Sequence, residues 1–217
     1  EDQFAMLKRL ELPTSAWPEL KQHAEERGLM FLSTPDDLDS ARLLRDLGLS
    51  ALKVGSAELT NRPFLRDLAR LGLPLILSTG MGTMLEVALA VSTGRPVCVV
   101  LLHAVSAYPA PAGELNLRAM TSLRQAFGVP TGLSDHSLGA AAAVLGAGLG
   151  MAVLEKHLTL DRAGQGPDHA ASADPAQFRE MVRLLREAET MLGSGLKAPT
   201  RSEADTRSAV RRVLLYT

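Results

Sequence analysis

The chain has 217 residues, of which 46% are hydrophobic and 22% are charged, and its formal net charge is −1. This length allows one good-sized core, or one domain with a short appendage. The balanced charge argues against nucleic acid or an anionic membrane as a partner. No apolar stretch reaches the roughly 20 residues that span a bilayer, and no signal peptide is visible, so we expect a cytoplasmic protein. The single cysteine, Cys98, lies inside an apolar run and is expected to be a buried thiol.

Short apolar runs alternate with longer amphipathic segments along the chain. The runs start roughly 22 residues apart, with one interval of about 32, which is typical of βα units. Each run is continuous rather than alternating, as in parallel strands that are buried on both faces. The predicted strands are Leu29–Ser33, Ala51–Gly55, Pro74–Thr79, Val97–Ala104, Val129–Ser134 and Met151–Thr159.

The segments between these runs are predicted to be helices. Asp36 or Asp37 can cap the first of them, and Gly48 follows it as a stop. The pair Asp174–Pro175 combines an N-cap with a proline at the first helical position. A weaker, charged helix is predicted over Ser202–Arg212, with no strand after it.

About six βα units indicate a parallel α/β fold, either a doubly wound sheet or a (β/α)8 TIM barrel. Every run ends in small polar or ionisable residues. A barrel gathers all such ends around one mouth, whereas a doubly wound sheet concentrates them at a single switch point. We therefore expect a barrel that is incomplete, because two of its strands are missing or unrecognised.

Two histidines, His136 and His157, end the last two runs. Adjacent parallel strands would bring the two imidazoles together, which suits a divalent metal site with open positions. The alternative is that each is a hydrogen-bonded core residue.

A lysine, Lys53, lies inside an apolar run, where an ammonium is costly without a partner. An anionic ligand at the barrel mouth would supply that partner. Hydroxyl donors stand at neighbouring strand ends, namely Ser56, Ser78, Ser106 and Ser134. Glu58 is a candidate for proton transfer or an ordinary acid at a helix start, and Asp168 is a sugar ligand or a turn residue.

Several motifs together resemble the N-acetylneuraminate (sialic acid) synthase family, which includes legionaminic and pseudaminic acid synthases and a spore-coat polysaccharide synthase. The resemblance runs over essentially the whole chain. The motifs are Phe31–Pro35, Lys53–Glu58, Leu77–Met81, Tyr108–Pro111, Ser134–His136, Glu155–His157 and Gly166–His169.

The resemblance implies a (β/α)8 barrel that condenses phosphoenolpyruvate with N-acetylmannosamine or a related amino sugar and releases phosphate. It implies that Lys53 holds phosphoenolpyruvate together with the hydroxyls of Thr34, Ser56, Ser78 and Ser134. Ser106 occupies a substrate-binding position where the family has a small polar residue. It further implies that His136 and His157 bind Mn2+, or Mg2+ or Co2+ in its place. The sugar site would be lined by Glu58, Tyr108 and Asp168. A homodimer is also implied.

The family's signatures of strands one and two do not occur in this sequence, so we expect a fragment that lacks both strands. Residues 1–198 would be the partial barrel domain, and residues 199–217 a helix and linker toward an absent antifreeze-like domain. Two other functions stay open: an inactive barrel that binds a sugar or phosphate in polysaccharide or coat assembly, and a neighbouring phosphoenolpyruvate aldol synthase.

Overall fold

The computed structural model describes residues 2–94 and 96–212. The strands are β1 (Leu52–Val54), β2 (Leu75–Ser78), β3 (Val99–Ala104), β4 (Thr131–Asp135) and β5 (Leu154–Lys156). The α-helices are α1 (Gln3–Leu10), α2 (Ala16–Glu25), α3 (Leu38–Asp46), α4 (Arg62–Arg70), α5 (Met84–Ser92), α6 (Ala119–Phe127), α7 (Ala141–Gly148), α8 (Pro175–Leu192) and α9 (Ala204–Val210). Short 3-10 helices are η1 (Ser56–Glu58), η2 (Ala112–Glu114) and η3 (Arg201–Glu203).

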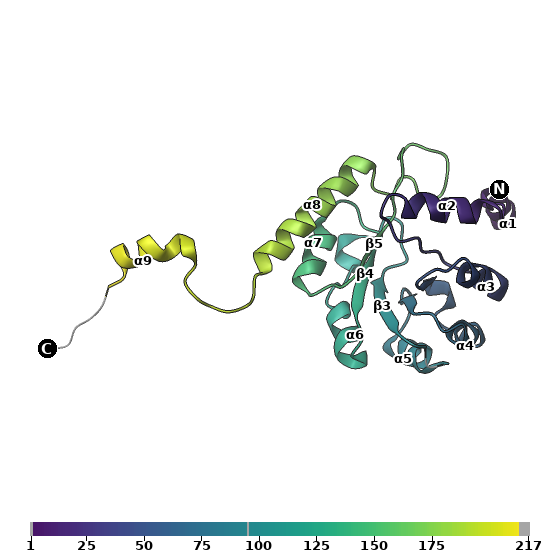
Figure 1. Ribbon diagram of the computed structural model, residues 1–217, viewed down its shortest axis with the longest axis horizontal. Coiled ribbons are helices and arrows are strands. Elements are labelled where there is room, and N and C mark those ends of the chain that lie inside the picture. The colour runs from purple at the N-terminus through teal and green to yellow at the C-terminus, as the bar shows by residue number, and fades with distance from the viewer. Residues whose placement is uncertain (1, 95, 213–217) are drawn as a thin grey trace.

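The strands form one parallel sheet in the order β1-β2-β3-β4-β5. Each strand pairs with the next strand along the chain, whereas a doubly wound sheet reverses its order at a switch point. The helices that connect the strands lie around the outside of the curled sheet (Figure 1). The fold is therefore an α/β structure with a curled parallel half-barrel, and the doubly wound alternative is wrong.

Leucines fill the layer between the sheet and its helices. Leu52, Leu68 and Leu101 are completely buried and belong to one cluster that joins β1 and β3 to α4. Burying one such side chain contributes about 1.5–3 kcal/mol. All of β4 is buried, whereas no residue of β5 is fully buried. The sheet is thus held firmly at its centre and more loosely at the β5 edge.

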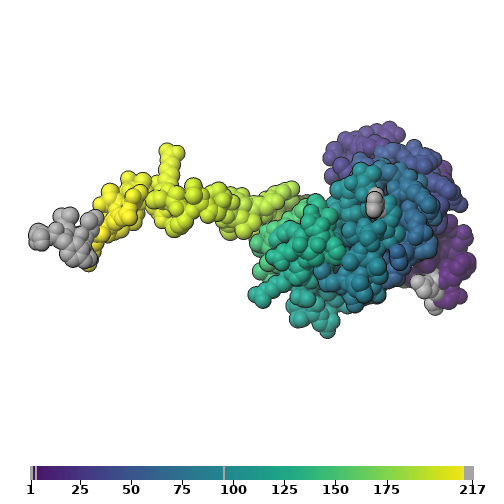
Figure 2. Space-filling view, turned by 90° about the horizontal axis from the view of Figure 1, so that it is seen from below, coloured from purple at the N-terminus to yellow at the C-terminus, as the bar shows by residue number. Residues whose placement is uncertain are grey.

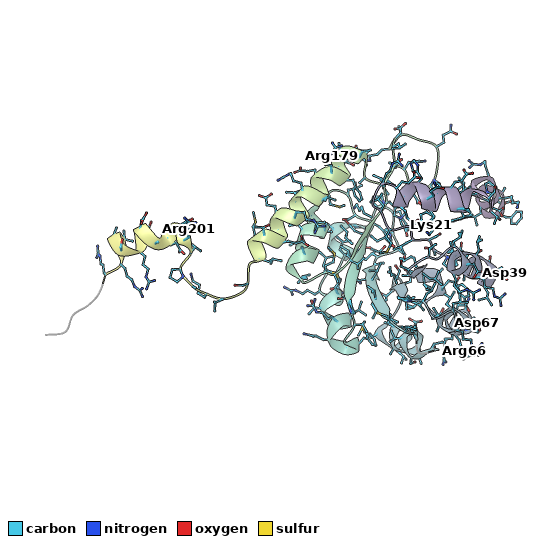
Figure 3. All side chains as sticks on the ribbon, in the orientation of Figure 1. Lys21, Asp39, Arg66, Asp67, Arg179 and Arg201 are labelled. Carbon is cyan, nitrogen blue, oxygen red and sulfur yellow. The ribbon has the colours of Figure 1, made fainter. Side chains whose placement is uncertain are left out.

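The predicted helix boundaries are confirmed where the sequence carries capping residues. Asp37, rather than Asp36, caps α3 by accepting the Ser40 amide, and Gly48 follows the helix with a φ of 79°. Asp174 caps α8 in a capping box with Gln177. Charged side chains such as Asp39, Asp67 and Arg179 point outward from α3, α4 and α8 (Figure 3), as the mixture of charges along these segments predicts.

The prediction of a strand over Leu29–Ser33 is wrong. This segment makes one backbone hydrogen bond to β1, from the Lys53 amide to the Ser33 carbonyl, at 3.1 Å. Leu29 and Met30 are 61% and 69% exposed. Phe31 packs against the core, but a single bond forms no ladder, so the described chain has five strands rather than six.

The prediction that Cys98 is buried is also wrong. The strand begins at Val99, one residue after the cysteine, and the Cys98 side chain is exposed. Its carbonyl still accepts a hydrogen bond from the Leu75 amide at 2.9 Å. The apolar run therefore extends past the covered part of the strand, and Cys98 lies on the uncovered end.

The chain continues past α8 through an extended connection to η3 and α9. This segment, which carries Arg201, projects away from the rest of the molecule (Figures 1 and 2). The predicted domain boundary at residues 198–199 falls in this connection. Within residues 2–94 and 96–212, no helix has the length and apolar character that crossing a membrane requires.

Candidate active site

Polar side chains from several strands meet at the carboxyl edge of the sheet. Lys53 lies on β1, Ser78 ends β2, and Ser134 on β4 is aligned with Glu155 on β5. The strands are parallel, so all of these ends point to the same side, which is the side where barrel enzymes carry their chemistry.

The ammonium of Lys53 has partners from both edges of the sheet. Its Nζ donates to Ser78 Oγ at 2.9 Å and to the Val54 carbonyl at 3.2 Å. Glu155 Oε2 lies 3.4 Å away, and the Lys53 side chain is only 13% exposed. These partners offset the cost of placing an ammonium within an apolar strand.

The hydroxyl of Ser134 connects this cation to the first histidine. It donates to Glu155 Oε1 at 2.6 Å, and its oxygen lies 3.3 Å from His136 Nε2. Ser134 is 3% exposed and His136 is 8% exposed. Lys53, Glu155, Ser134 and His136 therefore form one continuous polar chain across the interior of the curled sheet.

The contact of His136 Nδ1 determines which ring nitrogen of this histidine carries the proton. Nδ1 lies 2.7 Å from the Val105 carbonyl oxygen. Because a carbonyl can only accept, Nδ1 carries the proton in the neutral ring and Nε2 presents a lone pair. Burial lowers the pKa of His136, against the opposing effect of the Val105 hydrogen bond, and His157 lowers it further. The neutral ring is the form that binds metal ions.

Three aromatic rings meet beside this polar chain. The centroid of His136 lies 5.4 Å from that of His157, and the ring of Tyr108 lies 4.2 Å from His136 and 5.5 Å from His157. Asp168 Oδ2 lies 3.6 Å from His157 Nδ1. Burial raises the pKa of Tyr108, with further contributions from Asp168 and Glu155, so its phenol stays protonated and able to donate.

The two imidazoles are the side chains that would hold the implied divalent ion, as a pair of nitrogen ligands. His136 presents an unprotonated Nε2, 3.3 Å from Ser134 Oγ, and its ring is in edge-to-face contact with His157. In the part of the chain that the structure describes, no group of three or more His, Cys, Asp or Glu side chains could hold a metal ion. Two nitrogen ligands leave the other coordination positions to water or substrate, as catalytic sites require.

A second set of hydroxyls converges at the turn after β2. The Gly80 amide donates to Ser56 Oγ at 3.0 Å. A Cβ at Gly80 would lie 2.4 Å from Ser106 Oγ and 2.8 Å from Ser56 Oγ, so only glycine fits between the two serines. The turn therefore brings Ser56 and Ser106 together at the same rim.

Two further residues of the predicted site, Thr34 and Glu58, lie outside the polar chain of Lys53, Glu155, Ser134 and His136. Thr34 lines a cavity of about 410 Å³ that also borders Trp17 and Asp36. Glu58 accepts a hydrogen bond from Asn61 at 2.6 Å. Burial raises the pKa of Asp36, and the nearby charge of Glu58 raises it further. Neither Thr34 nor Glu58 is among the hydrogen-bond or ion-pair partners of Lys53 in the described residues.

The residue that the sequence prediction missed is Glu155. Its two-residue spacing from His157 placed it on the histidine's face, but no role followed from that alone. The signal that could have identified it is Lys53, an ammonium within an apolar strand that needs a counter-charge. A neighbouring cavity of about 530 Å³, bordered by Pro109, Ser137 and Leu145, is lined by no titratable side chain.

Known proteins resemble this chain in sequence. The profile of the NeuB family matches residues 1–197. N,N'-diacetyllegionaminic acid synthase from Legionella pneumophila is 43% identical over 217 residues, which is 97% of this chain and 61% of that protein. Human N-acetylneuraminate-9-phosphate synthase is 35% identical, over 88% of this chain and 54% of its own length. The chain thus spans about three fifths or less of these relatives.

A solved structure matches at the level of the fold. The crystal structure of N-acetylneuraminic acid (sialic acid) synthetase from Leptospira borgpetersenii serovar Hardjo-bovis, in complex with citrate, is 32% identical. The match has a TM-score of 0.87 and covers 96% of this chain and 75% of that one. The half-barrel with polar residues at its strand ends therefore has the architecture of a sugar-acid synthase. The chain belongs to the NeuB family.

Proposed function

We propose that this chain is part of a synthase that joins phosphoenolpyruvate to an N-acetylated amino-sugar aldehyde, N-acetylmannosamine or a relative, giving a nonulosonic acid and phosphate. The main observation is that Lys53 and its hydroxyl neighbours share one rim with the histidine pair. Membership of the NeuB family supports the proposal, as do the relatives named for sialic-type acids. In this proposal the half-barrel belongs to a (β/α)8 barrel.

The cationic edge of the site suits phosphoenolpyruvate, which carries a phosphate and a carboxylate. Lys53 supplies the charge, and the hydroxyls supply directed donors. These are Thr34, Ser56, Ser78, Ser106 and Ser134. Because Glu155 lies 3.4 Å from Lys53, the arriving anion replaces an internal ion pair. Holding the anion in this way contributes alignment and charge stabilisation to the reaction.

The opposite edge of the site suits the sugar. His136 and His157 would hold the divalent ion, Mn2+ or otherwise Mg2+ or Co2+, which supplies Lewis acidity at the aldehyde oxygen. Tyr108 and Asp168 would hydrogen-bond the sugar, and Glu58 would move a proton. A carbon–carbon bond forms between C3 of phosphoenolpyruvate and the aldehyde carbon. Water adds at C2, and the C2–oxygen bond to phosphate then breaks.

The test is phosphate release from phosphoenolpyruvate by the full-length protein, with Mn2+ and a panel of N-acetylated hexosamines. We expect release that requires both a sugar and the metal. Thermal stabilisation by phosphoenolpyruvate or sugar without release under any combination would contradict the enzyme proposal and favour a binding protein of coat or polysaccharide assembly. The molar mass of the same preparation in solution tests the predicted homodimer.

A further inference from the structure

A buried ion pair joins the carboxyl ends of β4 and β5. Lys156 Nζ lies 2.8 Å from Asp135 Oδ2, and the two side chains are 3% and 0% exposed. Ser137 donates to Asp135 Oδ1 through its amide at 2.9 Å and its hydroxyl at 2.7 Å. Lys156 also donates to the Ser137 carbonyl. Both charged groups therefore have hydrogen-bond partners within the protein.

This pair lies directly behind the two histidines. Asp135 and Lys156 are aligned partners in the β4–β5 ladder and the last residues of their strands, and His136 and His157 follow them directly. Successive side chains of a strand point to opposite faces. Lys156 accordingly borders a small cavity with Met181 of α8, on the face away from the proposed substrates.

The β5 edge depends on such a link more than the rest of the sheet does. β5 has three residues, all of them only partly buried. His136 is anchored by its own hydrogen bond to Val105. Within the described residues, the His157 ring has no comparable hydrogen bond, since its ion-pair partner Asp168 lies 3.6 Å away. The backbone of His157 is held by the Ala173 amide, which donates to its carbonyl at 2.9 Å, and by β5, so the position of its ring relative to His136 depends in part on how β5 is fixed to β4.

Stability alone gives a weak reason for this pair. Desolvating two charges costs several kcal/mol per ion, and well-packed apolar replacements of a buried pair are often neutral or stabilising. We infer that Asp135 and Lys156 are positioning residues, which fix the spacing of the His136 and His157 imidazoles for a shared divalent ion. This inference rests on the proposed metal-dependent function.

The test measures Mn2+ binding to the metal-free, full-length protein. The electron paramagnetic resonance signal of free Mn2+ reports the binding, so the measurement does not depend on turnover. The double variant Asp135→Leu/Lys156→Met removes both charges together. We expect it to fold, with a melting temperature close to that of the wild type, and to bind Mn2+ about 10- to 100-fold more weakly, the size of effect typical of groups that support metal ligands.

The matched control is a variant of Arg124, which holds the segment that leads into β5. Arg124 donates to the carbonyls of Leu149 and Gly150 at 3.0 and 2.9 Å, ahead of β5. Arg124→Met should lower the melting temperature and leave the Mn2+ affinity unchanged. Should the double variant fail to fold, Ser137→Ala, which removes one hydrogen bond to Asp135, is expected to weaken Mn2+ binding several-fold.

Three results would overturn the inference. If the folded double variant bound Mn2+ with the affinity of the wild type, the positioning role would be wrong, although the metal site itself would be supported. Equal weakening by Arg124→Met would reduce the effect to general stability. No Mn2+ binding by the wild type would remove the metal proposal itself, and the positioning role with it.

Discussion

Lys53 and Glu155 lie on the two edge strands of the sheet, β1 and β5, yet their charged groups are 3.4 Å apart. In a flat sheet, four strand spacings of about 4.8 Å would separate these strands by about 19 Å. That is more than an extended lysine and an extended glutamate bridge together. The ion pair therefore requires the curl of the sheet, and the curl is what builds one site from residues that are remote in sequence.

Removing the Lys53 ammonium is expected to weaken phosphoenolpyruvate binding. Lys53→Met keeps the apolar stem and deletes the charge. A hydrogen bond to a charged group contributes about 1.5–3 kcal/mol, so we expect the KM for phosphoenolpyruvate to rise at least about tenfold. Steady-state kinetics of the full-length protein measure this. Lys21→Met is the control, because Lys21 pairs with Glu25 on α2; a KM unchanged in Lys53→Met would remove the anion site.

Loss of the His136 imidazole is expected to abolish metal-dependent turnover. His136→Ala deletes the neutral nitrogen that faces Ser134 and His157. His23→Ala is the matched control, because His23 is exposed on α2 and contacts Arg27. Phosphate release over a Mn2+ titration compares the two variants. Activity in His136→Ala with an unchanged Mn2+ requirement would contradict the metal assignment.

The spacing of apolar runs predicted most of the fold, because a βα unit is a local pattern. Helix starts at Asp37 and Asp174 were predictable for the same reason, since a cap involves residues three apart. The segment Leu29–Ser33 has the composition of a strand but lacks a ladder partner in the described chain. The composition of a segment indicates which secondary structure it favours. Whether it joins a sheet depends on a partner strand elsewhere in the chain.

The candidate site was predictable to the extent that it depends on strand ends. That rule brought Lys53, Ser78, Ser134 and His136 to one rim. It did not reveal that Glu155 is the counter-charge of Lys53, because that contact depends on the curvature of the whole sheet. Nor could it place the side chains of Thr34, which follows a segment that forms no strand, and of Glu58, which lies on η1.

The exposed thiol of Cys98 predicts rapid chemical labelling of the folded protein. Its side chain lies outside the covered part of β3, so a reagent reaches it without unfolding. We expect Ellman's reagent to modify it in the native protein at a rate within about tenfold of that in denaturant, since reactivity follows thiolate access. Cys98 is the single cysteine of this sequence, and Cys98→Ser controls for any cysteine outside it. A reaction that required denaturant would mean that another part of the protein covers this end of the sheet.

The adjacent carboxylates Asp36 and Asp37 are expected to act on stability in opposite directions. Burial and the nearby Glu58 raise the pKa of Asp36, whereas the Ser40 backbone hydrogen bond lowers that of Asp37. A raised carboxyl pKa means that the folded state holds the proton more tightly, so stability falls as the pH rises from the unfolded value of about 3.9 through the folded pKa. At neutral pH the full penalty of a charged Asp36 is present. A lowered pKa gives the reverse, so the charge of Asp37 stabilises the fold at neutral pH and loses this effect as the pH falls.

Substituting each aspartate by asparagine tests the direction of both effects on stability. Asp36→Asn should raise the melting temperature at pH 7, and the gain should shrink at about pH 4.5, closer to the unfolded pKa. Asp37→Asn should lower the melting temperature at pH 7 slightly, because asparagine still caps α3 but lacks the charge that favours a helix N-terminus. Thermal unfolding of both variants at the two pH values is the measurement. A loss of stability in Asp36→Asn at pH 7 would show that its carboxylate makes a favourable contact that outweighs the repulsion from Glu58.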